Sequence, residues 1–392
     1  MPVTRGITWC GKLWVAAWLV AWWIHPSSYA EDQPADQQPT QEAAASTEDK
    51  APSKNEDAST PTTAQGVKSK IAVIHLDNPT GVAVNAAGNG HVFIVSKQGV
   101  FRYVPGSPAK IYLEVKGFGS DVYGKGPMYD IGPLGVTLWG NNRLIVSDGS
   151  RKDGEELVRI YKIGEKPPEA GAIPNEDSAE FTLGPISPSD DSPMGEGNFY
   201  ASVVWKEAIY ITSNGDDTKG WVLRATMKDG KPEELKPWLA TKPQVEVDAP
   251  IAITTTPDGS ELVIGQGGEV NVPGDSLLTF YDADGKLLRK FSTGLHDITG
   301  LAYSPKTGRL YATDFAWADP KQSGLFELTL DGDQLHARRI DVLDKEGKPF
   351  HIDRPTALAF DKDGGLYITV FGLNMDTGDK PAGGLIRLEP GL

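Results

Sequence analysis

Short apolar segments separated by tight polar turns recur along the chain from about residue 71 to the C-terminus. Each copy of the pattern has a turn with Pro or Gly, an apolar segment, a tight polar turn, and then second and third apolar segments. Copies about 50 residues apart are typical of units built from four short strands. The six copies begin at Pro79, Pro133, Asn198, Pro250, Ile298 and Pro355.

The sixth copy reaches the end of the chain with only three predicted strands, the last at residues 385–388. An additional apolar segment, residues 71–76, precedes the first copy and can supply the missing strand. Placed beside residues 385–388, it would close a ring and leave only short, protected sheet edges. The pattern therefore predicts an all-β fold: a six-bladed β-propeller with four-stranded blades, closed by an N-terminal strand added to the last blade.

Two segments of different composition precede the predicted propeller. Residues 1–30 have a basic start, an apolar run at 13–24 and a small-x-Ala ending at Ala30, which is typical of a signal peptide. The run is shorter than the roughly 20 residues that span a bilayer. Residues 31–70 are mostly Ala, Gln, Pro, Ser, Thr and acidic residues, which predicts a disordered acidic tether. We expect a secreted or periplasmic propeller at 71–392, with no stable membrane span after cleavage.

The composition restricts the partners of this chain. It has 38 Lys and Arg against 53 Asp and Glu, a net charge of -15. Binding of nucleic acid depends on basic residues that displace counterions from phosphates, so this balance argues against a nucleic-acid partner. The single cysteine, Cys10, lies in the predicted signal peptide. The mature domain would therefore fold without disulfides, and its acidity favours neutral or cationic ligands.

Loop lengths indicate which face of the propeller carries the site. The loops that join second to third strands, and those that lead into the next blade, emerge on one face. Most of the long predicted loops belong to this set, including residues 116–132, 186–197 and 371–382. Long loops on a rigid scaffold usually carry function. We call this the long-loop face, call the opposite one the tight-turn face, and expect a small molecule, a carbohydrate or a protein to bind on the long-loop face.

Polar and aromatic residues are expected where the strands meet the long-loop face. Asp and Asn oxygens are suitable ligands for Ca²⁺, so Asn214 and Asp314 are candidate metal ligands. Asp and Asn also cap turns, which leaves a purely structural role open for each. Trp317 could stack on a ligand or cover the neighbouring blade. The predicted ligand-binding residues are Asp148, Asn214, Gln266, His296, Asp297, Asp314, Trp317 and Arg354.

Two strand pairs carry a resemblance to known propellers. The segments Pro79-Thr80-Gly81-Val82-Ala83-Val84 and Pro355-Thr356-Ala357-Leu358-Ala359-Phe360, with the strands that follow them, resemble NHL-type and SMP-30/gluconolactonase-type six-bladed propellers. The second resemblance implies a lactonase that holds a divalent metal through four ligands. Those ligand positions fall near Pro79 and Pro250 and on Thr299 and Thr356, so none of the four ligands is kept.

A further resemblance lies in the segment Leu76-Asp77-Asn78-Pro79-Thr80-Gly81, which is similar to the opening of quinone-dependent sugar dehydrogenases. It implies a histidine base and basic residues around an anionic cofactor, for which His296 and Arg354 are the candidates. The sequence assigns no catalytic residue. It predicts an exported ligand- or protein-binding module acting through the long-loop face, with a metal-dependent lactonase-like hydrolase and a quinone-dependent sugar dehydrogenase as alternatives.

Overall fold

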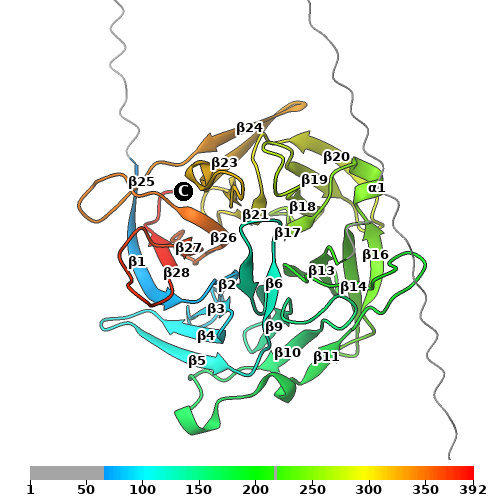
Figure 1. The fold of residues 1–392 in the computed structure, drawn as a ribbon, viewed down its shortest axis with the longest axis horizontal. Helices are drawn as coiled ribbons and strands as arrows, with labels where there is room; N and C mark the ends of the chain where they lie inside the picture. The colour runs from blue at the N-terminus through cyan, green and yellow to red at the C-terminus, as the bar shows by residue number, and fades with distance from the viewer. Residues whose placement is uncertain (1–65, 216–218) are drawn as a thin grey trace, which may run out of the picture. The chain divides into compact units, whose positions relative to one another are not determined.

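A computed structural model describes residues 66–215 and 219–392. The predicted signal peptide and most of the predicted tether lie outside these residues. The described chain forms six β-sheets arranged as blades around a central axis (Figure 1), so the predicted six-bladed propeller is confirmed. Its one α-helix is the single turn α1 (Lys242–Val245). No helix in the described part of the chain has both the length and the apolar character needed to cross a membrane.

Blades 1 to 3 follow one another along the chain, each with its first strand innermost. Blade 1 contains β2 (Gly81–Val84), β3 (Val92–Ser96), β4 (Gly99–Val104) and β5 (Lys110–Val115). Blade 2 contains β8 (Gly135–Trp139), β9 (Arg143–Ser147), β10 (Val158–Lys162) and β11 (Phe181–Leu183). Blade 3 contains β12 (Ser202–Trp205), β13 (Ala208–Ser213), β14 (Trp221–Lys228) and β16 (Lys236–Ala240), with the short β15 (Lys231–Pro232) also paired to β14.

Blades 4 to 6 complete the ring. Blade 4 contains β17 (Pro250–Thr255), β18 (Leu262–Gln266), β19 (Leu277–Tyr281) and β20 (Leu287–Ser292). Blade 5 contains β21 (Ile298–Tyr303), β22 (Leu310–Asp314), β23 (Gly324–Asp331) and β24 (Gln334–Arg339). Blade 6 contains β26 (Asp353–Phe360), β27 (Leu366–Gly372), β28 (Gly383–Leu388) and β1 (Val67–Leu76), and the two-residue β25 (Val342–Leu343) pairs with the start of β1.

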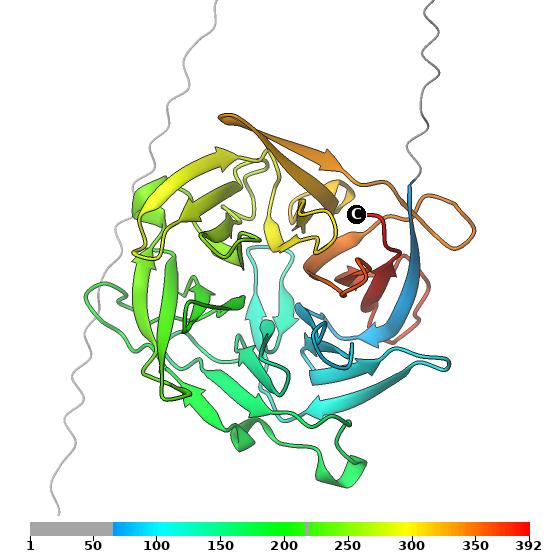
Figure 2. The same ribbon diagram turned by 180° about the vertical axis from the view of Figure 1, so that it is seen from behind.

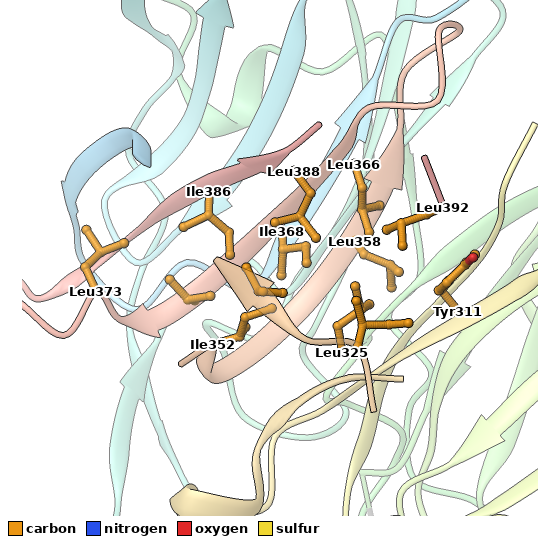
Figure 3. Close-up of a cluster of buried hydrophobic side chains, with 13 residues drawn as sticks. Tyr311, Leu325, Ile352, Leu358, Leu366, Ile368, Leu373, Ile386, Leu388 and Leu392 are labelled. Carbon is orange, nitrogen blue, oxygen red and sulfur yellow. The ribbon is translucent and has the colours of Figure 1, made fainter. Parts of the chain in front are cut away.

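The core lies between neighbouring blades. The second strands of the blades are mainly apolar and almost completely buried because a blade packs on each of their faces, and β18, β22 and β27 are buried at every position. Outer strands such as β24 are mostly exposed. Figure 3 shows one such interface, where Leu358 and Leu366 of blade 6 face Tyr311 of blade 5. Burial on both sheet faces explains why these strands lack strict apolar-polar alternation.

The ring closes as predicted from the sequence. Strand β1 pairs antiparallel with β28, with Ile71 opposite Ile386 and Val73 opposite Leu385. In Figure 2 the blue first strand lies beside the red last strand. The strand already begins at Val67, ahead of the predicted start, because Val67 pairs with Val342 of β25 and the Ser69 hydroxyl donates a 2.8 Å hydrogen bond to the Leu343 carbonyl. Residues 67–70 thus form strand rather than tether.

Threonine hydroxyls tie the innermost strands of consecutive blades together. Each donates to a main-chain carbonyl of the next blade around the ring. The three bonds run from Thr80 to Pro133 (2.7 Å), from Thr299 to Pro355 (2.8 Å) and from Thr356 to Pro79 (2.7 Å). The recurring Thr after the first-strand turn therefore has a structural purpose, because a buried carbonyl at the blade interface needs a donor.

We expect Gly135→Ala to destabilise the ring. Gly135 starts the innermost strand of blade 2, and a Cβ atom there would overlap the Tyr200 carbonyl oxygen of blade 3. Forcing two backbones apart in a packed interface should lower the free energy of unfolding by about 1–3 kcal/mol. Urea unfolding measures this, with Gly171→Ala as the control because no atom lies within 4 Å of a Cβ at that exposed position. Equal stabilities for the two variants would contradict the close approach.

Candidate functional site

A cavity of about 760 Å³ occupies the channel between the six blades. Residues of all six innermost strands line it: β2, β8, β12, β17, β21 and β26. Each of these strands pairs with a neighbour on one side only, so its second edge has no strand partner. A free strand edge presents N–H and C=O groups. The channel therefore offers backbone hydrogen-bonding groups along its wall.

The side chains that line the cavity are mainly small or aliphatic. They include Val82, Val136, Leu301 and Leu358, together with alanines and glycines from several blades. Within the described residues, the charged members of the lining are Asp297, Asp361 and Lys362. The wall thus combines apolar surface with a few placed polar groups, which is the usual composition of a small-molecule site.

The cavity opens toward the tight-turn face. Lining residues just beyond the ends of three innermost strands, Ala87, Pro305 and Lys362, are exposed to solvent. They lie in the turns that lead from β2, β21 and β26 to the second strands. The other end of the cavity is lined by buried residues, among them Phe315, Trp317 and Phe371.

A hairpin closes the long-loop end of the channel. It consists of β6 (Asp121–Tyr123) and β7 (Tyr129–Ile131), within the segment that the sequence indicated only as a long loop. Figure 1 shows β6 near the centre of the ring. Aromatic rings from the hairpin, from the loops of blades 3 and 5 and from β27 of blade 6 pack together at this end. We define the aromatic plug as Tyr123, Tyr129, Tyr200, Phe315, Trp317 and Phe371, all of which line the cavity.

The rings of the aromatic plug pack mostly edge to face. The Tyr129 ring lies 5.1 Å from Trp317 and 5.2 Å from Phe371, with interplanar angles of 74° and 76°. The Tyr200 and Tyr123 hydroxyls are 2.8 Å apart and hydrogen-bonded. Such geometry is favoured by the ring quadrupoles. The packed rings account for the closure of the channel at this end.

Polar contacts fasten the hairpin to three blades. Lys125 forms a 2.8 Å ion pair with Glu269 in blade 4. The Asn78 side-chain amide of blade 1 donates to the Asp130 carbonyl at 2.8 Å. Arg354, from blade 6, donates to the Tyr129 hydroxyl at 2.9 Å and holds Asp353 through two further bonds of 2.8 and 2.9 Å. These contacts raise the pKa of Arg354, so the predicted ligand residue Arg354 is an anchor of the hairpin.

Two of the carboxylates predicted to bind a ligand instead form hydrogen bonds within the loops of the long-loop face. Asp148 is fully buried, accepting a 2.8 Å hydrogen bond from Arg159 and a 2.6 Å bond from the Ser150 hydroxyl. Asp314 accepts from the main-chain N–H groups of residues 296, 297 and 316 at 3.0, 2.8 and 3.1 Å. Their oxygens thus serve the turn-capping role that the sequence left open.

The remaining predicted residues divide between the interior of the fold and the cavity. Asn214 and Gln266 are buried at the ends of β13 and β18, and His296 is half-buried before β21. None of these three lines the cavity, whereas Asp297 and Trp317 both do. Of the eight predicted ligand residues, the structure brings only this pair to the central cavity.

Asp297 is the carboxyl group at the closed end of the cavity. It is 5% exposed, and its Oδ2 accepts a 2.6 Å hydrogen bond from the Trp317 main-chain N–H. Burial raises the pKa of Asp297 to about 7. The hydrogen bond from Trp317 lowers this pKa, whereas the negative charges of Asp314 and Asp275 raise it. Asp297 therefore changes charge near neutral pH, which an ordinary aspartate does not.

The residues present do not fit the metal or the quinone suggested by the resemblances. In the described residues no group of three or more His, Cys, Asp or Glu is arranged to hold a metal ion. Thr299 and Thr356, at two of the implied ligand positions, donate their hydroxyls to the next blade. The cavity lining contains neither His nor Arg among those residues, and Arg354 is already paired with Asp353. An anionic cofactor would therefore meet one basic residue of the described lining, Lys362, which stands beside Asp361.

Glu156 is an unusual residue that the sequence did not single out. It is 1% exposed, between blades 2 and 3, and accepts a 3.3 Å bond from the Phe199 main-chain N–H. Burial, followed by the nearby carboxylates of Asp148 and Asp153, raises its pKa to about 10. Glu156 is thus a neutral acid at physiological pH.

We expect Glu156→Gln to stabilise the protein at neutral and alkaline pH. The unfolded glutamate ionises near 4.5 and the folded one near 10, so the folded state binds the extra proton between these values. Stability therefore falls as pH rises from 4.5, by about 3 kcal/mol at pH 7. The glutamine amide keeps the acceptor and removes this loss. Urea unfolding at pH 5 and pH 8, with exposed Glu155→Gln as control, should show a gain only for Glu156→Gln, at most about 1 kcal/mol at pH 5 and several-fold larger at pH 8.

Comparisons with known proteins support the fold. No protein-family model and no curated protein matches the chain. An oxidoreductase from Thermus thermophilus described as a glucose dehydrogenase has 15% sequence identity and a TM-score of 0.54, covering 83% of this chain and 100% of its own. PQQ-bound aldose sugar dehydrogenase from Streptomyces coelicolor has 15% identity and a TM-score of 0.55, covering 82% and 97%. A gluconolactonase from Xanthomonas campestris has 14% identity and a TM-score of 0.48, covering 82% and 89%.

Sugar dehydrogenase propellers are thus among the solved structures that share this fold. At this low identity, the two similarities with TM-scores above 0.5 show the fold alone. The NHL-type resemblance stays a prediction.

Proposed function

We propose that this protein is an exported binding module that takes a small neutral or cationic molecule into its central channel from the tight-turn face. The observation that carries the proposal is the cavity of about 760 Å³, within the size range of ligand pockets, with an exposed mouth and a closed end. The long-loop face contributes the aromatic plug that closes it. The free strand edges offer donors and acceptors, and the aliphatic side chains offer apolar contact.

The charge of the lining supports a neutral or cationic ligand over an anion. Lys362 is the one basic residue among the described lining residues, and it stands beside Asp361 at the mouth. A ligand deeper in the channel meets Asp297 without a basic side chain to balance an anionic group. The sugar dehydrogenase and lactonase alternatives derive from the fold alone, and the residues that each chemistry needs do not line this channel.

The test is to narrow the channel. Ala359 lines the cavity from β26, so Ala359→Leu should weaken binding of the neutral fluorescent probe 1-aminoanthracene at least tenfold by occupying its volume. The control, Ala318→Leu, makes the same change at an exposed position of the long-loop face. Probe affinity measured by fluorescence titration should be unchanged in the control. Equal affinity for both variants, or a loss confined to Ala318→Leu, would contradict a site in the channel.

A further inference from the structure

The closed end of the cavity combines aromatic rings with one carboxyl group. The six rings of the aromatic plug and Asp297 all line the same end of the channel. From these residues we infer that the cavity binds an organic cation there, with a quaternary ammonium group between the rings and Asp297. This inference rests on the proposed function, because it names the class of ligand that the channel takes.

Aromatic rings attract cations through the negative potential over their faces, with the largest effect when water is excluded. Phe315, Trp317 and Phe371 are each less than 10% exposed, so a cation among them would be shielded from water. Tyr129 already takes part in one such contact: the guanidinium of Arg354 lies 5.9 Å from its ring centroid. Arg354 does not line the cavity, so it leaves the cavity side of the Tyr129 ring open to a cationic ligand.

The charges around the closed end also favour a cationic ligand. Asp297 is the charged lining residue at this end, and the acidic Asp314 and Asp275 stand close enough to influence its pKa. The nearest histidine in sequence, His296, affects Asp275 electrostatically. A bound cation would favour the ionised carboxylate, since opposite charges stabilise each other in a poorly solvated site.

Hydrogen-bonding capacity selects the type of cation. A primary ammonium brings three N–H donors that need acceptors when buried. At this end the Tyr129 hydroxyl accepts from Arg354, the Tyr123 and Tyr200 hydroxyls bond to each other, and Asp297 accepts from the Trp317 main chain. A quaternary ammonium has no N–H group and presents only methyl groups to its surroundings. Six aromatic rings and one carboxyl group line this end, so most of the surface that a cation meets suits methyl groups, and we expect a methylated ammonium to bind better than a primary one.

The experiment compares choline with its neutral carbon isostere, 3,3-dimethylbutan-1-ol, by calorimetry on the mature protein at pH 8. This pH lies above the pKa of about 7 for Asp297. We expect choline to bind at least tenfold more tightly than the isostere. Asp297→Asn should reduce that preference several-fold, because the aromatic rings remain. Phe371→Leu, which replaces a ring by an aliphatic side chain, should weaken choline several-fold and leave the isostere unchanged. Ethanolamine should bind more weakly than choline.

The outcomes separate this inference from the proposed function. Binding of 1-aminoanthracene by each variant shows that it is folded and that its channel is intact. If the probe binds and choline shows no preference over the isostere, the cation site is wrong while the channel module stands. If the probe does not bind the unmodified protein, the proposed function is wrong and the cation site falls with it. A choline preference that is unchanged in Asp297→Asn would also overturn the assignment of the carboxylate.

Discussion

Leu76→Asp is expected to abolish the cooperative unfolding transition or to lower the free energy of unfolding by more than about 4 kcal/mol. Leu76 is 2% exposed and packs with Val82, Ile94 and Leu385, where β1 joins the last blade to the first. A carboxylate there would be buried without a partner, and the alternative is to release the strand that closes the ring. Circular dichroism during urea unfolding measures the effect.

The control for this prediction comes from the same strand. Ile74 is 42% exposed, so Ile74→Asp places the same charge on the solvent side of β1. We expect it to change stability by about 1 kcal/mol or less. Similar losses for the two variants would mean that β1 adds no inward-facing contacts to the ring, contrary to the described packing.

Asp148→Ala is expected to cost about 3–5 kcal/mol of stability, the range for breaking a buried ion pair from one side. The variant leaves the guanidinium of Arg159, which is 1% exposed, with Glu176 at 2.9 Å as its remaining acidic partner. Thermal unfolding and 1-aminoanthracene titration should show a large loss of stability with unchanged probe affinity in the folded fraction.

The matched control is Asp130→Ala on the same face. Asp130 also pairs with a basic residue, Lys97 at 2.5 Å, but the two side chains are 53% and 29% exposed. Exposed pairs contribute at most about 1 kcal/mol. If Asp148→Ala were as mild as Asp130→Ala, or if it removed binding without affecting stability, Asp148 would be a ligand residue rather than a structural one.

The sequence predicted the ring well because each blade repeats its pattern locally. The second strands stood out as apolar runs, and Thr80, Thr299 and Thr356 recur at one position because each repeat contacts the next in the same way. In blade 3 the copy begins at Asn198, but the first strand begins only at Ser202. The fourth strand of blade 5 ends at Arg339, and the apolar Val342 beyond it pairs with Val67, a partner that local periodicity cannot reveal.

The candidate site was harder to predict, because it depends on contacts between distant segments. The hairpin strands β6 and β7 have three residues each, too few to show a period. A signal was present in the two tyrosines, Tyr123 and Tyr129, on either side of Gly124-Lys125-Gly126-Pro127. The sequence placed Trp317 and Asp297 on the long-loop face, but it could not show that Tyr123 and Tyr129 pack against Trp317. Nor could it show that Asp148, Asp314 and Arg354 are engaged within the fold.

The pairing of β1 with β28 also determines the order of folding events. The first strand of the domain to leave the ribosome has its partner among the last residues of the chain, as the pairing of Ile71 with Ile386 shows. Contacts of such long range form late and slow the folding of a domain. The first five blades can assemble as they are synthesised, while the sixth must wait for the whole chain. Until then both edges of the unfinished ring stay open, and this nascent state is the one most exposed to aggregation.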